Sequence, residues 1–397
     1  MKRFYLLTLT SFMLFFLTVQ GKAQVVEKSS LKIGFKSAGV VQFLEDDDKN
    51  NSFGDVPYGF QSAVGNLTFD ANIVNGIDVY FDLYLSSKHH EGTVYSHEGY
   101  IYLSHLPEDS DPFGFNRIFK YIDIKAGHFE LDFGNQHLVR SDNADVQRNP
   151  LIGNYIVDAN TVSPSAEVIG HPNPFYWVGG VSMGTTTGDF KESRGTAFYG
   201  KIGSDYNNML NVAGSYYRVD HSKNPTGYPN SGSFSSLFSG NRSGGRYSGV
   251  LGGGPEPGQI KPGKGQDVTA WQVDATLKYK RLTVSGLFGL VKDADINGSA
   301  DGTPEEKWSY YGGEAKYDLY SGLYAAARYN VADVVKMNGL EAEGTVSRLQ
   351  LGLGVWVVPG MLLKAEYVNH VTKDFTTTDL QYDPKFSGFL TEVSISF

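Results

Sequence analysis

The stretch Phe389-Leu390-Thr391-Glu392-Val393-Ser394-Ile395-Ser396-Phe397 decides the fold class, because its residues alternate between two chemical sets. One parity carries Phe389, Thr391, Val393, Ile395 and Phe397, and the other carries Leu390, Glu392, Ser394 and Ser396. A β-strand places successive side chains on opposite faces, so the pattern predicts a strand with one apolar face. Many soluble strands also alternate, so the interpretation depends on the rest of the chain.

The same alternation recurs in other segments of about ten residues, the length that a tilted membrane strand needs. Clear examples are 77–86, 271–280 and 348–357. A soluble all-β protein is the alternative, but it would rarely combine so many long alternating strands with such unequal connections. We therefore predict an all-β chain that forms a transmembrane barrel.

Residues 1–23 have the features of a secretory signal peptide. Lys2 and Arg3 precede an almost wholly apolar run, and Gly21-Lys22-Ala23 offers small residues before a cut ahead of Gln24. A membrane anchor is the alternative, although the apolar run is short for a spanning helix. We predict that residues 24–397 form the mature barrel as one domain.

Composition narrows the function classes further. The chain has 25 Tyr, 25 Phe and 47 Gly, which suits aromatic girdles and glycine-tolerant strands. Removing Lys2, Arg3 and Lys22 changes the net charge from −9 to −12, which argues against nucleic acid as a partner. The absence of cysteine excludes disulfides and thiolate metal sites.

The connections between the predicted strands fall into two classes. Tight turns include 75–76, 205–208, 280–281, 320–322 and 359–360, and long polar loops include 44–60, 131–163, 221–266, 292–304, 335–344 and 372–384. Short and long connections alternate along most of the chain, as in barrels with short periplasmic turns and long external loops. We therefore expect every long polar loop on the outer side.

Counting the segments gives sixteen antiparallel strands, an even number that places both chain ends on one side. The least certain strand is 164–170, which is short and contains Pro164. It is included because the count would otherwise be odd. A barrel of sixteen strands is wide enough to leave a lumen, whereas eight strands would be filled by side chains.

Three stretches between residues 125 and 148 carry a resemblance to a known family. They are Lys125-Ala126-Gly127-His128-Phe129, then Asp132-Phe133-Gly134, then the arginine-containing loop through Arg140 and Arg148. With them the chain resembles sixteen-stranded bacterial outer-membrane porins, nearest the phosphate-selective porin superfamily. The resemblance implies location in the outer membrane of a Gram-negative cell and folding of loop 131–163 into the lumen as a constriction.

The same resemblance implies the function and the partners. The function would be ion and solute transport, as a diffusion channel that passes small hydrophilic solutes or ions without a cofactor or energy source. Partners would be outer-membrane lipid, the barrel-assembly machinery, the solutes and other copies in a homotrimer, with Phe397 as the assembly signal. The alternatives are a substrate-selective anion or sugar channel, a structural or adhesin barrel with a plugged lumen, and a barrel enzyme.

Loop 131–163 supplies the candidate site residues. Its apolar run at 151–157 would be costly to leave in water, which favours packing inside the barrel over an ordinary external loop. The constriction candidates are Lys125, Arg140, Asp142, Asp145 and Arg148. Nothing here has the spacing of metal ligands or of a nucleophile with its base, so we predict no metal site and no enzyme.

If the apolar parity faces lipid, the other parity lines the lumen. Nine basic and eight acidic residues then fall on the strand walls. A nearly balanced wall predicts a weak charge preference, because strong selectivity requires a ring of one sign. The sequence does not specify the solute, the pore radius or the oligomeric state.

Overall fold

A computed structural model of the chain describes residues 29–46, 58–87, 94–182, 196–219, 237–238, 247–248, 260, 262, 267–294, 305–337, 340–341, 343–375 and 385–397. The predicted signal peptide, residues 1–23, lies outside the described residues. Parts of the predicted loops 44–60, 221–266, 292–304, 335–344 and 372–384 also lie outside them.

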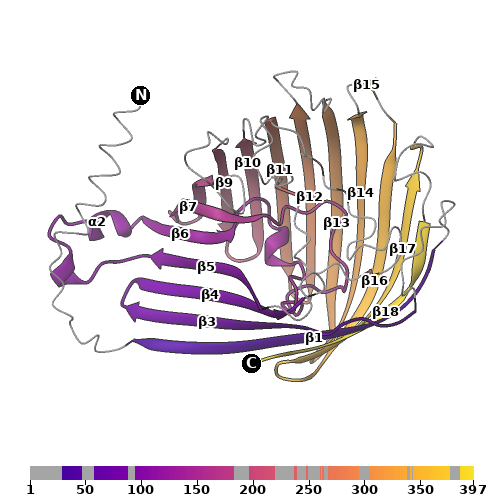
Figure 1. Ribbon diagram of the computed structural model, residues 1–397, viewed down its shortest axis with the longest axis horizontal. Helices are drawn as coiled ribbons and strands as arrows, with labels where there is room; N and C mark the ends of the chain where they lie inside the picture. Colours follow the sequence, from indigo (N-terminus) through magenta and orange to yellow (C-terminus); the bar gives the residue numbers. More distant parts are fainter. Residues whose placement is uncertain are drawn as a thin grey trace.

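The described residues form a closed antiparallel barrel of sixteen long strands (Figure 1). The strands are β1 Ser30–Asp46, β3 Val64–Val74, β4 Ile77–Ser86, β5 Tyr95–Leu103, β6 Ile122–Glu130, β7 Val162–Gly170, β8 Phe175–Ser182, β9 Ala197–Tyr206, β10 Leu210–Val219, β11 Asp267–Tyr279, β12 Leu282–Ala294, β13 Glu306–Tyr320, β14 Leu323–Met337, β16 Thr345–Val358, β17 Met361–Lys373 and β18 Lys385–Ser396. Two short strands, β2 Tyr58–Phe60 and β15 Leu340–Glu341, extend the sheet locally.

The barrel closes where the last strand meets the first. β18 pairs antiparallel with β1 from Lys36↔Ser396 to Asp46↔Phe386, and β1 pairs on its other side with β3. The predicted count of sixteen strands is confirmed. The least certain segment is also a strand, because β7 pairs with β6 along its whole length despite Pro164.

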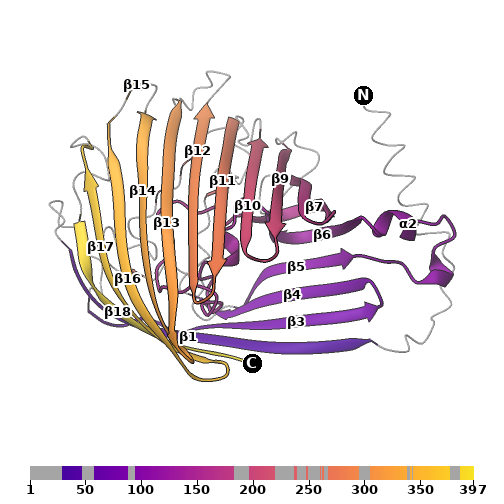
Figure 2. The same ribbon diagram turned by 180° about the vertical axis from the view of Figure 1, so that it is seen from behind.

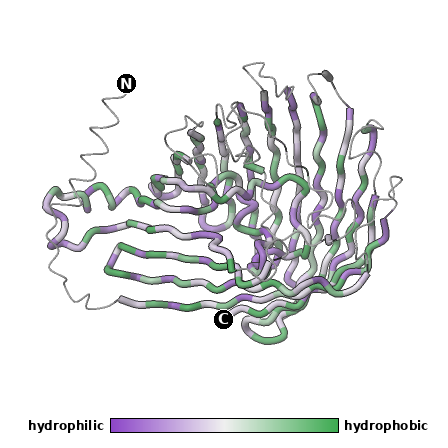
Figure 3. The backbone as a smooth tube through the Cα atoms, viewed as in Figure 1, coloured by the Kyte–Doolittle hydropathy of each residue, from purple (hydrophilic) through white to green (hydrophobic). Residues whose placement is uncertain are grey.

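The two faces of the wall differ as the sequence parity predicts. In β16, Leu349, Leu351 and Leu353 are exposed on the outside, whereas Arg348 and Gln350 are buried on the inside. Hydrophobic and hydrophilic residues alternate along the strands in the same way (Figure 3). An exposed apolar outer wall suits lipid rather than water as its surroundings.

Tight turns connect the strands at one end of the barrel, and we call this the short-turn end. At 207–208 both asparagines have positive φ, the conformation that two-residue hairpin turns require. Gly76 has φ +86 at the turn before β4, where a Cβ would collide with His105.

One connection at the short-turn end is long, contrary to the expectation that every long loop lies outside. Residues 104–121 join β5 to β6 through a 3-10 turn, η1 Glu108–Ser110, and a short helix, α2 Asn116–Phe119. Both views show this segment beyond the ends of β3, β4 and β5 (Figure 2). None of the helices in the described residues is long and apolar enough to cross a membrane.

Candidate functional site

The candidate site is the loop of residues 131–161, which lies inside the barrel. It follows Glu130 of β6 and ends before Val162, so the last two residues of the predicted loop belong to β7. Its side chains and backbone contact wall strands on several sides of the lumen, among them β1, β9, β14 and β18. Figure 1 shows the segment between the wall of β3–β6 and the wall of β12–β14.

The first part of the loop is held by β9, β10 and β11. Lys201 of β9 donates to the carboxylate of Asp132 and to the carbonyl oxygen of Gly134, both at 2.8 Å. The Gly134 N–H donates to Ser215 Oγ at 3.0 Å. The side-chain amide of Gln272 donates to Gln136 Oε1 at 2.6 Å. These contacts fix the entry of the loop into the lumen.

The middle part is held by β1, β3, β4 and β5. Asp142 accepts a hydrogen bond from the Tyr84 hydroxyl and lies 2.8 Å from His97 Nε2. Asn143 donates to Asn66 Oδ1 at 2.6 Å. Asp145 forms an ion pair with Lys36 at 2.8 Å. Two predicted site residues, Asp142 and Asp145, therefore join the loop to the wall.

The last part of the loop is held by β14 and β17. Lys364 Nζ donates to the carbonyl oxygens of Val146, Asn149 and Leu151 at 2.8, 3.1 and 3.0 Å. The carboxylate of Glu366 accepts the N–H groups of Ile152 and Gly153 at 2.6 and 3.1 Å. Arg328 donates to the carbonyl oxygen of Gly153 at 2.7 Å. Such charge-assisted bonds are stronger than neutral ones.

Arg140, a predicted constriction residue, is only 1 % exposed. Its guanidinium forms ion pairs with Glu130 and Asp158 and donates to the carbonyl oxygen of Ala159 at 2.8 Å. These acceptors surround the charge, so Arg140 joins the two ends of the loop and does not present its charge to the lumen.

Arg148 and Lys125 lie in different settings from Arg140. The Arg148 side chain is 33 % exposed, 3.6 Å from Asp145, and lines an internal cavity. Lys125 on β6 lies 3.7 Å from Glu167 and 4.0 Å from the centroid of the Phe129 ring. Of the predicted basic candidates, Arg148 is therefore the one that faces the cavity.

This cavity lies between the loop and the short-turn halves of β8–β13, and its volume is about 520 Å³. Its charged lining carries both signs: Asp132, Arg148, Lys201, Asp205, Asp274, Lys278, Glu314 and Lys316. Several of these groups are already paired within the wall or with the loop, as Lys201 is with Asp132 and Lys316 with Asp318. The cavity therefore has a mixed lining of charged, polar and apolar side chains, and its formal charges are balanced.

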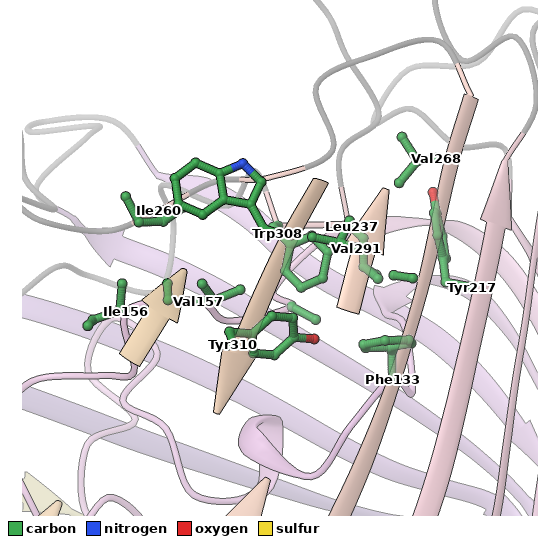
Figure 4. Close-up of a cluster of buried hydrophobic side chains, with 14 of the residues drawn as sticks. Phe133, Ile156, Val157, Tyr217, Leu237, Ile260, Val268, Val291, Trp308 and Tyr310 are labelled. Carbon is green, nitrogen blue, oxygen red and sulfur yellow. The ribbon is translucent and has the colours of Figure 1, made fainter. Parts of the chain in front are cut away.

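Apolar packing also joins the loop to the wall of the barrel. Phe133, Ile156 and Val157 pack against wall residues such as Trp308 and Tyr310, and residues 237 and 260 join the same cluster (Figure 4). The Ile260 N–H donates to the carbonyl oxygen of Ile156 at 2.9 Å. As the apolar run at 151–157 predicts, these residues are buried inside the barrel.

Burial and pairing shift the pKa of three loop groups. Burial alone would raise the pKa of Asp142, but His97, Arg140 and Arg148 hold it well below its ordinary value. Burial would also raise the pKa of Asp132, but the ammonium of Lys201 at 2.8 Å helps to hold it below its ordinary value. Burial lowers the pKa of His137 to about 3, so this imidazole is neutral at pH 7.

Sequence reasoning did not identify the wall residues that anchor the loop. Arg328, Lys364 and Glu366 have the inward parity, but nothing in the local sequence shows which inward charges meet backbone groups of a distant loop. One general rule could have pointed to them. Buried N–H and C=O groups of a loop need hydrogen-bond partners, and inward-facing charged residues on β14 and β17 can supply these partners.

Comparison with known proteins places this geometry in a structural class. A scan against protein-family models found no match, and neither did a search of curated protein sequences. Among solved structures, the anion-selective porin from Comamonas acidovorans aligns with a TM-score of 0.60 at 13% identity, over 93% of this chain and 100% of that one. The chain has the fold of outer-membrane porins.

Two further structures show the same likeness. The trimer form of OmpT, an outer membrane protein of Vibrio cholerae, aligns with a TM-score of 0.56 at 11% identity, over 94% of this chain and 100% of that one. The outer membrane channel DcaP of Acinetobacter baumannii aligns with a TM-score of 0.54 at 13% identity, over 95% of this chain and 99% of that one. Fold and apolar outer wall together indicate an outer-membrane location.

Proposed function

We propose that this porin-like barrel is an outer-membrane channel for the passive diffusion of small hydrophilic solutes or ions. The observation that carries the proposal is the anchored loop 131–161 inside a sixteen-stranded barrel, with a cavity beside it that charged side chains of both signs line. A barrel of this size leaves room for a route past the loop. The protein acts without a cofactor and is not an enzyme.

The charge of the lining supports weak selectivity. The cavity combines four acidic with four basic side chains, and Arg148 is the basic group that the loop itself contributes. Balanced charges lower the energy barrier to passage for both anions and cations, so neither is selected strongly. The loop would set the narrowest point, and the solutes, outer-membrane lipid and the barrel-assembly machinery would be the partners. A homotrimer is consistent with the trimer form of the Vibrio structure.

The test is single-channel conductance of the purified, folded barrel in a planar bilayer. A diffusion channel should give discrete steps that scale with salt concentration and a small reversal potential across a salt gradient. The same preparation is first tested for folding. A folded barrel resists unfolding by detergent in the cold, and this resistance excludes a misfolded sample. Folded protein that never conducts would support the structural or adhesin barrel with a plugged lumen instead.

A substrate-selective anion channel is the second candidate, and the cavity-facing Arg148 with Lys278 favours it. The resemblance of the sequence to phosphate-selective porins makes phosphate the first solute to test. Phosphate at millimolar concentration should then reduce the chloride current, whereas sulfate serves as the divalent control and maltose as the uncharged one. An equal response to all three solutes would leave the general diffusion channel as the better description.

A further inference from the structure

The connection 104–121 has a shape that its own hydrogen bonds hold. The Asp111 carboxylate accepts the N–H groups of Phe115 and Asn116 at 2.6 and 3.0 Å. The Asn116 side chain accepts from the N–H of Leu106 and donates to its carbonyl oxygen, both at 2.8 Å. The two arms of the connection are therefore tied together by bonds within the segment itself.

This ordered segment nevertheless displays its apolar side chains. Phe113 is 69 % exposed, Ile118 is 52 % exposed and Tyr121 is 59 % exposed, while Phe119 alone among the large apolar residues of α2 is buried. The rings of Phe113 and Phe115 lie 5.8 Å apart and are both exposed. An ordered segment with several large apolar side chains this exposed is typical of an interaction surface.

The surface continues the apolar outer wall of the barrel. Ser104 and His105 donate their N–H groups to the carbonyl oxygen of Gly76, so the segment starts against the turn between β3 and β4. Beside it, Ile77, Leu103 and Ile124 occupy one row across β4, β5 and β6. This row shares the parity of the exposed Ile101, so lipid that covers the wall would reach the base of the segment.

Basic side chains accompany the exposed apolar residues of this segment. Arg117 and Lys120 are exposed beside Phe113 and Ile118, and Lys120 Nζ lies 5.6 Å from the centroid of the Tyr121 ring. The acidic Glu108 and Asp109 lie on η1, outside residues 111–121, and the Asp111 carboxylate is bonded to backbone N–H groups. Aromatic residues with neighbouring Lys and Arg are typical of the membrane–water interface, where the cations approach anionic headgroups.

We propose that residues 111–121 form a foot that docks on the lipid leaflet at the short-turn end of the barrel. Phe113, Ile118 and Tyr121 would lie among the lipid headgroups and upper acyl chains. Arg117 and Lys120 would bind the phosphates of anionic phospholipids. The foot would anchor one end of the barrel to its leaflet, and it does not depend on which solute the channel passes.

Site-directed spin labelling tests this proposal directly, because the chain contains no cysteine that would need removal. Nitroxide labels are placed singly through Phe113→Cys and Ile118→Cys in the full barrel, held in nanodiscs that expose both leaflets. Asp109→Cys on η1 is the control expected in water, and Ile101→Cys on the outer wall is the control expected in lipid. Relaxation by oxygen and by a polar nickel complex reports the surroundings of each label.

If residues 111–121 dock on lipid, oxygen should relax the labels at positions 113 and 118 more strongly than the nickel complex does. Their ratio of oxygen to nickel accessibility should lie between the ratios of the two controls. In nanodiscs with phosphatidylglycerol, Arg117→Gln with Lys120→Gln should shift the label at 118 toward water. The same pair should have little effect in phosphatidylcholine alone. Labels as accessible to nickel as the one at 109 would overturn the proposal. Labels sheltered from both reagents would also overturn it and would indicate a protein partner.

Discussion

At the scale of single residues, the two loop arginines have different roles. Arg148 lines the cavity, where water is restricted and a fixed charge acts strongly. Arg148→Ala should therefore shift the reversal potential toward cations. Arg281→Ala is the matched control in an exposed turn, where salt screens charges beyond roughly 8–10 Å. Equal shifts in the two variants would show that Arg148 does not border the solute route.

Arg140→Ala should act on stability and not on selectivity. The substitution leaves Glu130 and Asp158 buried beside each other without their shared cation. Removing one partner from a buried ion pair costs about 3–5 kcal/mol. Urea unfolding in detergent micelles should show this loss, and Arg148→Ala, whose arginine is partly exposed, should lose much less. A stable Arg140→Ala barrel with altered selectivity would contradict the assignment.

His137 makes stability depend on pH. Its pKa is lowered to about 3 in the folded protein, while an unfolded histidine titrates near 6.5. The unfolded state therefore binds more protons between these values, and stability falls as the pH drops through 6.5. This residue alone should cost up to about 2 kcal/mol between pH 7 and pH 5. His137→Gln should reduce the loss by that amount, and an unchanged pH dependence would contradict the prediction.

At the scale of elements, strand β17 helps to hold loop 131–161 in place. Lys364 donates to three loop carbonyls and forms an ion pair with Glu392 at 2.7 Å. Lys364→Met with Glu392→Gln removes these bonds without leaving an unpaired carboxylate. The double variant should show a larger and noisier conductance because residues 146–151 of the loop lose their contacts with β17. The control is Lys292→Met with Glu305→Gln, an ion pair near the other end of the barrel. Unchanged conductance in the first variant would show that the loop is not limiting.

Barrel closure depends on the pairing of β18 with β1. Beyond the strand, the Phe397 N–H donates to the carbonyl oxygen of Phe35 at 3.0 Å, and the two rings lie 5.5 Å apart. An unclosed edge would leave backbone groups unpaired in lipid, at several kcal/mol each. Deleting Phe397 should lower the yield of folded barrel in the membrane. Phe375→Ala, away from the seam, should not cause the same assembly defect. A normal yield without Phe397 would contradict the prediction that this residue is the assembly signal.

At the scale of the whole molecule, the sequence predicts the wall far better than the interior. Strand β11, residues 267–279, covers nearly all of the segment 271–280 whose alternation predicts a strand, because lipid outside and polar groups inside impose a period of two. The interior follows no such period. The burial of Arg140 depends on Glu130 and Asp158, which meet only after the loop folds back. The connection 104–121 was not predicted either, because its turns carry no alternation.

The difference between the apolar outer face and the polar inner face of the wall gives a final prediction. Leu351 lies near the middle of β16 on the outer face, where a lysine would have to enter the apolar core of the membrane. Leu351→Lys should cost about 2–4 kcal/mol in lipid vesicles. Val358→Lys, at the short-turn end of the same strand, should cost only about 0–1 kcal/mol, because a side chain near the interface reaches water. Reversible urea unfolding in vesicles compares the two variants. Equal losses would mean that the exposed apolar band does not face lipid, and the outer-membrane location would then lose its physical basis.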